Sequence, residues 1–172
     1  NTRSRGLGDV YKRQAHILLG IDPKQNMSDM LHNQASLLDL CTPAPFDLKF
    51  ISGGSGMVDI LNLDSAARFQ IVRSTEALAQ STDVLIVDVP AGASDATLNF
   101  VSAADRPLIV LVGEPTSFMD AYSLIKAAFL EADIKHFYVA VNMSNSETQA
   151  QDHFSRFREI TNRFLDVQLT YI

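Results

Sequence analysis

Short apolar runs alternate with amphipathic stretches along most of the chain. The run Val84–Val87 (VLIV) is continuous and rich in β-branched residues, which is typical of a strand buried on both faces. Runs of the same kind predict strands at residues 108–112, 137–141 and 167–172, and residues 47–52 (DLKFIS) are a further short strand candidate. Apolar residues at helical spacing predict helices at residues 66–80, 117–132 and 148–165. This alternation implies right-handed crossovers, so we expect an α/β fold with a mostly parallel sheet and helices on both faces.

The composition narrows the class of protein. The chain has 172 residues, of which 47% are hydrophobic and 20% charged, as in a globular domain and unlike a disordered chain. A net charge of −6 disfavours a fold that binds nucleic acid by neutralising its phosphates. The longest apolar runs have about five residues, far fewer than the roughly 20 that span a bilayer. Cys41 is the only cysteine, which excludes an internal disulfide framework and favours a reducing, cytoplasmic setting.

Residues 1–14 (NTRSRGLGDVYKRQ) differ from the rest of the chain. They carry four basic residues and one acidic residue, show no periodicity and lack a starting Met, so residues 15–172 carry a net charge of −9. We interpret them as a non-native leader, with a basic tail that binds nucleic acid or lipid as the alternative. The chain stops within the apolar run LTYI. We therefore expect a domain that is truncated at both ends.

Candidate chemistry lies directly after the predicted strands, because ligands of parallel sheets bind at the carboxyl ends of the strands. Asp88 follows the run 84–87 and opens the turn Asp88-Val89-Pro90-Ala91-Gly92. A carboxylate at a strand tip suits Mg²⁺ beside a nucleotide phosphate. Pro90 stiffens the turn, and Gly92 lets a backbone N–H approach a terminal phosphate. An ordinary turn or a helix N-cap accounts for the same residues.

Two later strands end in similar candidates. Glu114, Pro115 and Thr116 follow the strand at 108–112, where Thr116 or the next residue, Ser117, as a helix N-cap is a sufficient structural explanation. Asn142 follows the strand at 137–141, and its amide suits the edge of a purine base as well as an ordinary turn. The glycine-rich segment 53–56 (GGSG) lacks the Gly-Lys-Ser/Thr ending of a Walker A loop, so we expect a flexible turn there.

One long block carries a family resemblance. Residues 84–128 (VLIVDVPAGASDATLNFVSAADRPLIVLVGEPTSFMDAYSLIKAA) resemble the MinD/ParA class of deviant-Walker ATPases, and more narrowly the flagellar-number regulators FlhG and FleN. The segments HILLGIDPKQNMSDML, DLKFISGGSGMVDILNL, VNMSNS and RFLDVQLTYI fit the same family, so the resemblance covers about residues 15–172. It implies a P-loop NTPase-like fold.

The resemblance also implies roles for individual residues, with ATP and Mg²⁺ as cofactors. Asp88 matches the switch II aspartate, which holds Mg²⁺ through water and helps to place the attacking water. Gly92, in the same turn as Pro90, matches the glycine whose backbone senses the γ-phosphate. Asn142 matches the asparagine that reads adenine. A motif near the nucleotide and the dimer face is matched by Glu114, Pro115 and Thr116.

Two elements of the family are absent from the sequence. The deviant Walker A loop, with its lysine and Mg²⁺-binding threonine, and the aspartate-rich switch I segment both belong upstream of residue 15. Phosphoryl transfer depends on positioning and electrostatics, which that loop supplies. We therefore expect the intact parent to hydrolyse ATP and this chain to be inactive. Loss of the central strand that enters the loop exposes apolar strand edges, so we also expect aggregation or local opening.

At the level of function, the resemblance implies an ATP-dependent regulator of flagellar number and placement. Such a protein is cytoplasmic, peripherally associated with the inner face of the cell membrane, and a homodimer with ATP. Its implied partners are an SRP-type flagellar GTPase and flagellar switch or regulator proteins. The first alternative is a partition ATPase of the ParA kind or a septum-site ATPase, and the charge of −9 disfavours direct nucleic-acid binding. The second is a non-catalytic scaffold of the same fold.

Overall fold

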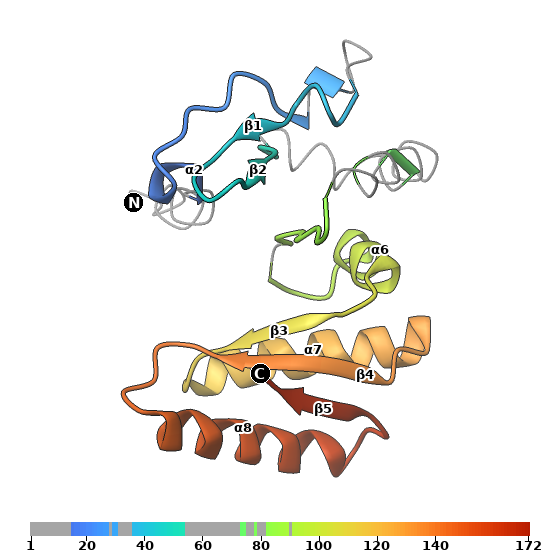
Figure 1. The fold of residues 1–172 in the computed structure, drawn as a ribbon. Coiled ribbons are helices and arrows are strands. Elements are labelled where there is room, and N and C mark those ends of the chain that lie inside the picture. The colour runs from blue at the N-terminus through green and yellow to red at the C-terminus, as the bar shows by residue number, and fades with distance from the viewer. Residues whose placement is uncertain are drawn as a thin grey trace, which may run out of the picture. The chain divides into compact units, whose positions relative to one another are not determined.

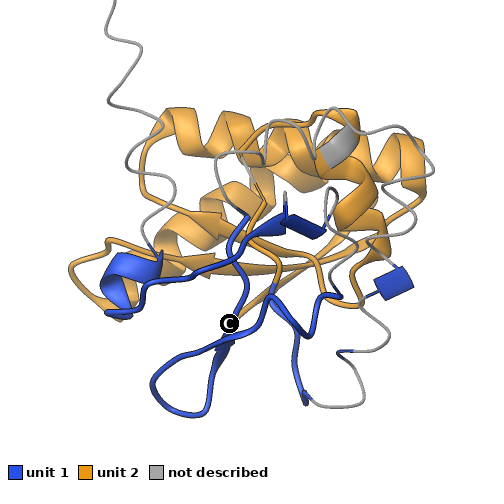
Figure 2. Cartoon of the chain, turned by 90° about the horizontal axis from the view of Figure 1, so that it is seen from above, with its two compact units in different colours: residues 1–86 blue, residues 87–172 orange. Residues whose placement is uncertain are grey.

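The chain divides into two compact units, residues 1–86 and 87–172 (Figure 2). The structure, a computed structural model, describes residues 15–27, 29–30, 36–53, 73–74, 78, 82–89 and 91–172. The expected leader at 1–14, most of the expected helix at 66–80 and Pro90 lie outside the described residues.

The first unit contains a short hairpin. Helix α2 (Ala15–Leu18) precedes strands β1 (Thr42–Pro43) and β2 (Lys49–Phe50), which pair antiparallel. A separate buried cluster is formed by Leu37, Leu40 and Leu78. Of the strand expected at 47–52, Lys49 and Phe50 form β2, which pairs with the antiparallel β1, and Ser52 forms an isolated parallel bridge with Asn26.

The buried strand expected at 84–87 is wrong in this structure. The four residues have no regular secondary structure, and their side chains are 73%, 49%, 85% and 50% exposed. A strand that is buried on both faces needs backbone partners on its edges. Among the described residues, no strand pairs with this run. Its apolar composition therefore does not produce burial by itself.

The second unit contains a parallel sheet of three strands (Figure 1). The strands β3 (Leu108–Leu111), β4 (His136–Val141) and β5 (Gln168–Tyr171) lie in the order β3-β4-β5. Leu108 is paired with Tyr138, and His136 with Gln168. Helix α7 (Pro115–Ala132) joins β3 to β4, and helix α8 (Glu147–Asn162) joins β4 to β5. The α/β class, the parallel sheet and these two helices are confirmed.

Local capping explains where the helices of this unit begin. The Ser146 hydroxyl accepts a hydrogen bond from the Gln149 N–H at 3.2 Å at the start of α8, as the spacing Ser-x-x-Gln favours. Helix α7 begins differently from the expectation, because its N-cap is Glu114 and not Thr116 or Ser117. Pro115 causes the shift, since its fixed φ and missing N–H suit the first helical position.

Helix α6 (Asp95–Ala103) was not expected from the sequence. It has nine residues, which is too short for a clear helical periodicity. The signal that marks it is the cap, where the Ser94 hydroxyl accepts from the Thr97 N–H at 3.2 Å. Its Leu98 and Val101 are buried, so α6 belongs to the core of the second unit.

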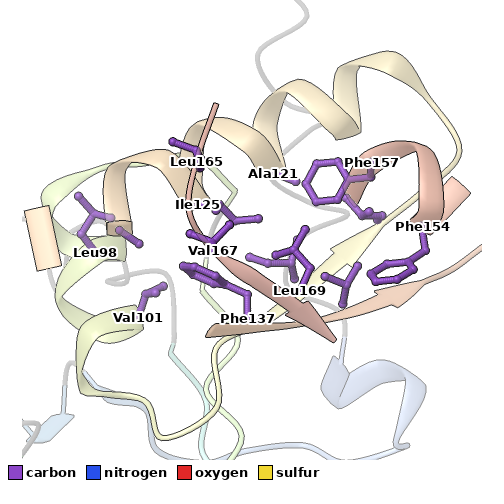
Figure 3. Packing of buried hydrophobic residues seen from close by; sticks show 14 residues of the cluster. Leu98, Val101, Ala121, Ile125, Phe137, Phe154, Phe157, Leu165, Val167 and Leu169 are labelled. Carbon is purple, nitrogen blue, oxygen red and sulfur yellow. The ribbon is translucent and has the colours of Figure 1, made fainter. Parts of the chain in front are cut away.

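One hydrophobic cluster joins the sheet to all three of these helices (Figure 3). Its buried members are Leu98, Val101, Ile109, Leu111, Ala121, Ile125, Ala128, Phe137, Val139, Phe154, Phe157, Leu165, Val167 and Leu169. The described helices therefore cover the sheet face to which Ile109 and Leu111 point. Along β3 the intervening Leu108 and Val110 are 50% and 58% exposed on the opposite face. None of the described helices is both long and apolar enough to cross a bilayer.

Candidate nucleotide-binding site

The structure brings the ends of β3 and β4 together. Asn142, which directly follows β4, donates its backbone N–H to the carbonyl oxygen of Leu111, the last residue of β3, at 2.7 Å. The two strands are parallel, so both present their carboxyl ends at this edge of the sheet. The segments expected to contain site residues after β3 and after β4 are therefore neighbours.

The turn from β3 into α7 is held by its own backbone and by one hydroxyl. The Glu114 N–H donates to the Val112 carbonyl oxygen at 2.7 Å, and the Val112 N–H donates to the Ser117 hydroxyl at 3.1 Å. The side chains of Glu114, Pro115 and Thr116 are exposed. A carboxylate and a hydroxyl are thus accessible on a turn whose backbone is already fixed.

A close approach between Gly113 and His153 supports this turn from α8. A Cβ atom at Gly113 would overlap Nε2 of His153, so only glycine fits without a shift of the ring. The half-buried ring also meets Phe118 edge-on, with ring centroids 6.4 Å apart. Gly113, Ser117 and His153 were not singled out as site residues from the sequence. A glycine between a strand and a helix start was the available signal.

The side chain of Asn142 is exposed and partly used by its own loop. Its Oδ1 accepts a hydrogen bond from the Met143 N–H at 2.8 Å, which leaves the amide NH₂ group to donate elsewhere. Met143 has a φ of 56°, a left-handed conformation that is unfavourable for its side chain. The loop after β4 therefore presents an amide donor from a constrained backbone.

Asp88 and Gly92 lie in the same unit, but no described contact joins them to Asn142 or to the turn after β3. Asp88 is exposed and lies outside regular structure. Gly92 has a φ of 107°, which only glycine adopts readily, and no atom lies within 4 Å of a Cβ built there. Glycine is thus required at position 92 by backbone conformation and not by crowding.

Within the described part of the chain, Asp88 does not belong to a metal centre made of protein ligands, because no group of three or more His, Cys, Asp or Glu side chains there could hold a metal ion. Mg²⁺ is commonly held by one or two carboxylates together with substrate phosphates and waters. A single exposed carboxylate therefore fits a Mg²⁺ that is shared with a triphosphate, and does not fit a site made of protein ligands alone.

Comparisons with known proteins indicate the family to which the chain is related. The chain is 32% identical over 164 residues to the antiactivator FleN of Pseudomonas aeruginosa, an alignment that covers 95% of this chain and 59% of FleN. The chain is related to the FlhG/FleN-like ATPases of the MinD/ParA type. It is also 24% identical over 165 residues to the flagellum site-determining protein YlxH of Helicobacter pylori, which covers 95% of this chain and 55% of YlxH.

A third relative, with a lower identity than FleN and a shorter alignment than YlxH, is named as an ATP-binding protein. An uncharacterised ATP-binding protein of Methanocaldococcus jannaschii is 25% identical over 118 residues, or 68% of this chain and 44% of that protein. No protein-family model matches the chain. The chain spans less than two thirds of the length of these relatives. The relationship confirms the expected family, while the roles of individual residues stay predictions.

Proposed function

We propose that the protein containing this chain regulates the number or placement of flagella as an ATP-dependent switch. The observation that carries this proposal is the 32% identity to FleN over 95% of the chain. The similarity to a flagellum site-determining protein supports the same role. The ATP-binding relative supports the choice of nucleotide.

In this proposal, the carboxyl edge of the sheet receives the nucleotide. The free amide NH₂ group of Asn142 donates to the adenine edge, while Glu114, Pro115 and Thr116 line the adjacent turn. Gly92 offers its backbone N–H to the terminal phosphate. Asp88, which is followed by Pro90 in the sequence, would hold Mg²⁺ and help to orient the attacking water. When bound, Mg²⁺ would supply positive charge beside the phosphates.

Two substitutions in the full-length protein separate these roles. Asp88→Ala is expected to abolish ATP hydrolysis while part of the nucleotide binding is kept, because the carboxylate acts on metal and water and not on the base. Asn142→Ala is expected to reduce the preference for ATP over GTP in equilibrium binding. Asn145→Ala, an exposed asparagine in the same loop, is the matched control and should leave that preference unchanged. Unchanged turnover in the Asp88 variant contradicts the assignment.

Hydrolysis by residues 15–172 alone is not expected. No Gly-Lys-Ser/Thr sequence occurs in the chain, so no lysine of that type contacts the phosphates. A steady-state phosphate-release assay on these residues should equal the buffer blank. Measurable turnover that disappears in the Asp88→Ala variant would overturn this part of the proposal.

The proposal extends to assembly. We expect the full-length protein to be a homodimer with ATP, to associate peripherally with the cytoplasmic face of the membrane, and to bind an SRP-type flagellar GTPase and flagellar switch or regulator proteins. Light scattering with a non-hydrolysable ATP analogue tests the dimer. A DNA titration at several salt concentrations tests the alternative of a ParA-type partition ATPase, whose affinity falls steeply with salt.

A further inference from the structure

An apolar groove of about 390 Å³ runs between α7 and α8. Its floor is formed by Phe118 and Phe157, whose rings meet edge-on with centroids 5.4 Å apart. Its walls are Met119 and Tyr122 from α7, and Ile160 with Phe164 from the end of α8 and the residues after it. Phe157 is buried, whereas Met119, Ile160 and Phe164 are 69%, 46% and 72% exposed. The groove is therefore an open hydrophobic surface that the described chain leaves uncovered.

Basic side chains flank this groove on both sides. Lys126 lies one turn beyond Tyr122 on α7, and Arg156 lies one turn before Ile160 on α8, so each shares a helix face with a wall residue. Both cations are exposed, although the chain as a whole carries a charge of −6.

Acidic side chains lie on the outer face of α8 and, as exposed Glu114, beside Pro115 at one end of the groove. On α8 the carboxylates Asp152 and Glu159 fall on the outer face of the helix, by their spacing from Phe157 and Ile160. Glu159 is also paired with Arg163, with a distance of 2.6 Å between Oε1 and the guanidinium nitrogen. An occupant of the groove thus meets apolar side chains at its centre and the cations Lys126 and Arg156 along its two helices.

We propose that this groove binds an amphipathic α-helix of a partner protein, with acidic residues on both flanks of its apolar stripe. The recessed floor favours a helix over a lipid surface, because a flat bilayer does not reach side chains between two helices. The lining residues of α7, from Pro115 to Tyr122, span about two helical turns, or roughly 10 Å. An occupant therefore uses apolar residues at positions i, i+3 or i+4, and i+7, as helices in grooves commonly do.

The groove is continuous with the candidate site. Pro115 lines one end of the groove and also belongs to the turn after β3. A bound helix at this end would contact that turn directly. The inference does not depend on nucleotide binding, because apart from Pro115 the residues that line the groove are not among the proposed nucleotide-binding residues.

The test uses two synthetic peptides and the full 172-residue chain. Both peptides carry leucine at i, i+3, i+4 and i+7 on a helical frame; one carries glutamate on both flanks of the leucine stripe, and the other lysine. In fluorescence anisotropy, the acidic peptide is expected to bind at least about tenfold more tightly than the basic peptide. Met119→Asp should weaken acidic-peptide binding by about tenfold or more. Met143→Asp, at a methionine that is 83% exposed elsewhere, should not.

A charge-reversal variant keeps the test independent of packing. Lys126→Glu and Arg156→Glu together remove no buried side chain, and the combination should reverse the preference between the two peptides. Equal affinity for both peptides, or binding unaffected by Met119→Asp, overturns the proposal. Pelleting with phosphatidylglycerol vesicles that needs Met119, without peptide binding, overturns it in favour of a membrane surface. Self-association that Met119→Asp abolishes overturns it in favour of a second copy of the chain.

Discussion

The contact between Gly113 and His153 predicts that Gly113→Ala destabilises the chain when His153 is present and stabilises it when His153 is removed. In Gly113→Ala the added Cβ would overlap Nε2 of His153, so the ring must move. Overpacking of this kind costs about 1–3 kcal/mol, and the lower half of that range applies because a histidine side chain can rotate. Replacing glycine by alanine also removes about 0.4–1 kcal/mol of unfolded-state entropy, since Gly113 is not among the positive-φ glycines. We expect a net loss of about 0.5–1 kcal/mol.

The same substitution in a His153→Ala background is expected to stabilise the chain. Without the ring the clash disappears, and only the entropic gain of about 0.4–1 kcal/mol remains. The coupling energy between the two positions is then about 1–2 kcal/mol, within the range for residues in contact. Urea unfolding of the full chain and its three variants, followed by circular dichroism, measures each term.

The control for this cycle is Gly92→Ala. Gly92 has a φ of 107° and no atom within 4 Å of a built Cβ, so alanine there is strained by backbone conformation alone. Its cost should be the same with and without His153. If Gly113→Ala is equally destabilising in both backgrounds, the steric explanation fails, and the turn after β3 requires glycine for another reason.

Three further predictions concern stability. Thr161→Val should raise the free energy of unfolding by about 1 kcal/mol, because the buried Thr161 hydroxyl has no hydrogen-bond partner; a loss of stability in urea unfolding contradicts this. Ile109→Ala should cost about 2–4 kcal/mol, whereas Val110→Ala, on the exposed face of the same strand, should cost less than about 1 kcal/mol; equal costs in the same assay would show that the second face is also buried. Hydrogen bonds from the Ser36 hydroxyl and backbone N–H hold the pKa of Asp39 below its usual value. Their contribution to stability is therefore present above the usual pKa and is lost as the pH falls through the lowered pKa. In a carboxyl NMR titration, Ser36→Ala should bring the pKa of Asp39 back toward the usual range.

Periodic segments of the second unit were predictable from the sequence because each buries one regular face, and the spacing of its apolar residues marks that face. Strands β3, β4 and β5 and helices α7 and α8 are found where apolar spacing places them. The cap of α7 was placed wrongly because Thr116 and Ser117 have good capping side chains, while the proline before them determines where the helix begins. Helix α6 depends on one capping serine, Ser94, and was therefore missed.

The run Val84–Val87 could not be assigned correctly from its own residues. Its composition predicts a buried strand, but strand formation depends on a partner that is distant in the sequence. Its side chains are exposed here, because no described strand pairs with it. An apolar composition means that a segment can be buried as a strand. Whether it is buried depends on a second strand of the same chain that pairs with it.

Some features of the candidate site could be predicted from the sequence and others could not. The rule that ligands lie beyond the carboxyl ends of strands correctly placed Asn142 and the turn from Glu114 to Thr116 at one edge of the sheet. It did not identify the glycine–histidine contact behind that turn, because Gly113 and His153 are 40 positions apart in the chain. Asp88 follows a run that is not a strand here. The order of the strands therefore does not fix how far Asp88 lies from Asn142.

The alternating exposure of β3 has a consequence for how that strand keeps its alignment. All four of its residues are aliphatic, so a slip by one position along β4 would exchange one apolar set for the other at little hydrophobic cost. The composition of β3 therefore does not select its own orientation. The selection is made where the strand stops, by the bonds from Asn142 to Leu111 and from Val112 to Ser117. The hydrogen bonds at the carboxyl end of β3 thus determine which face of the strand is buried.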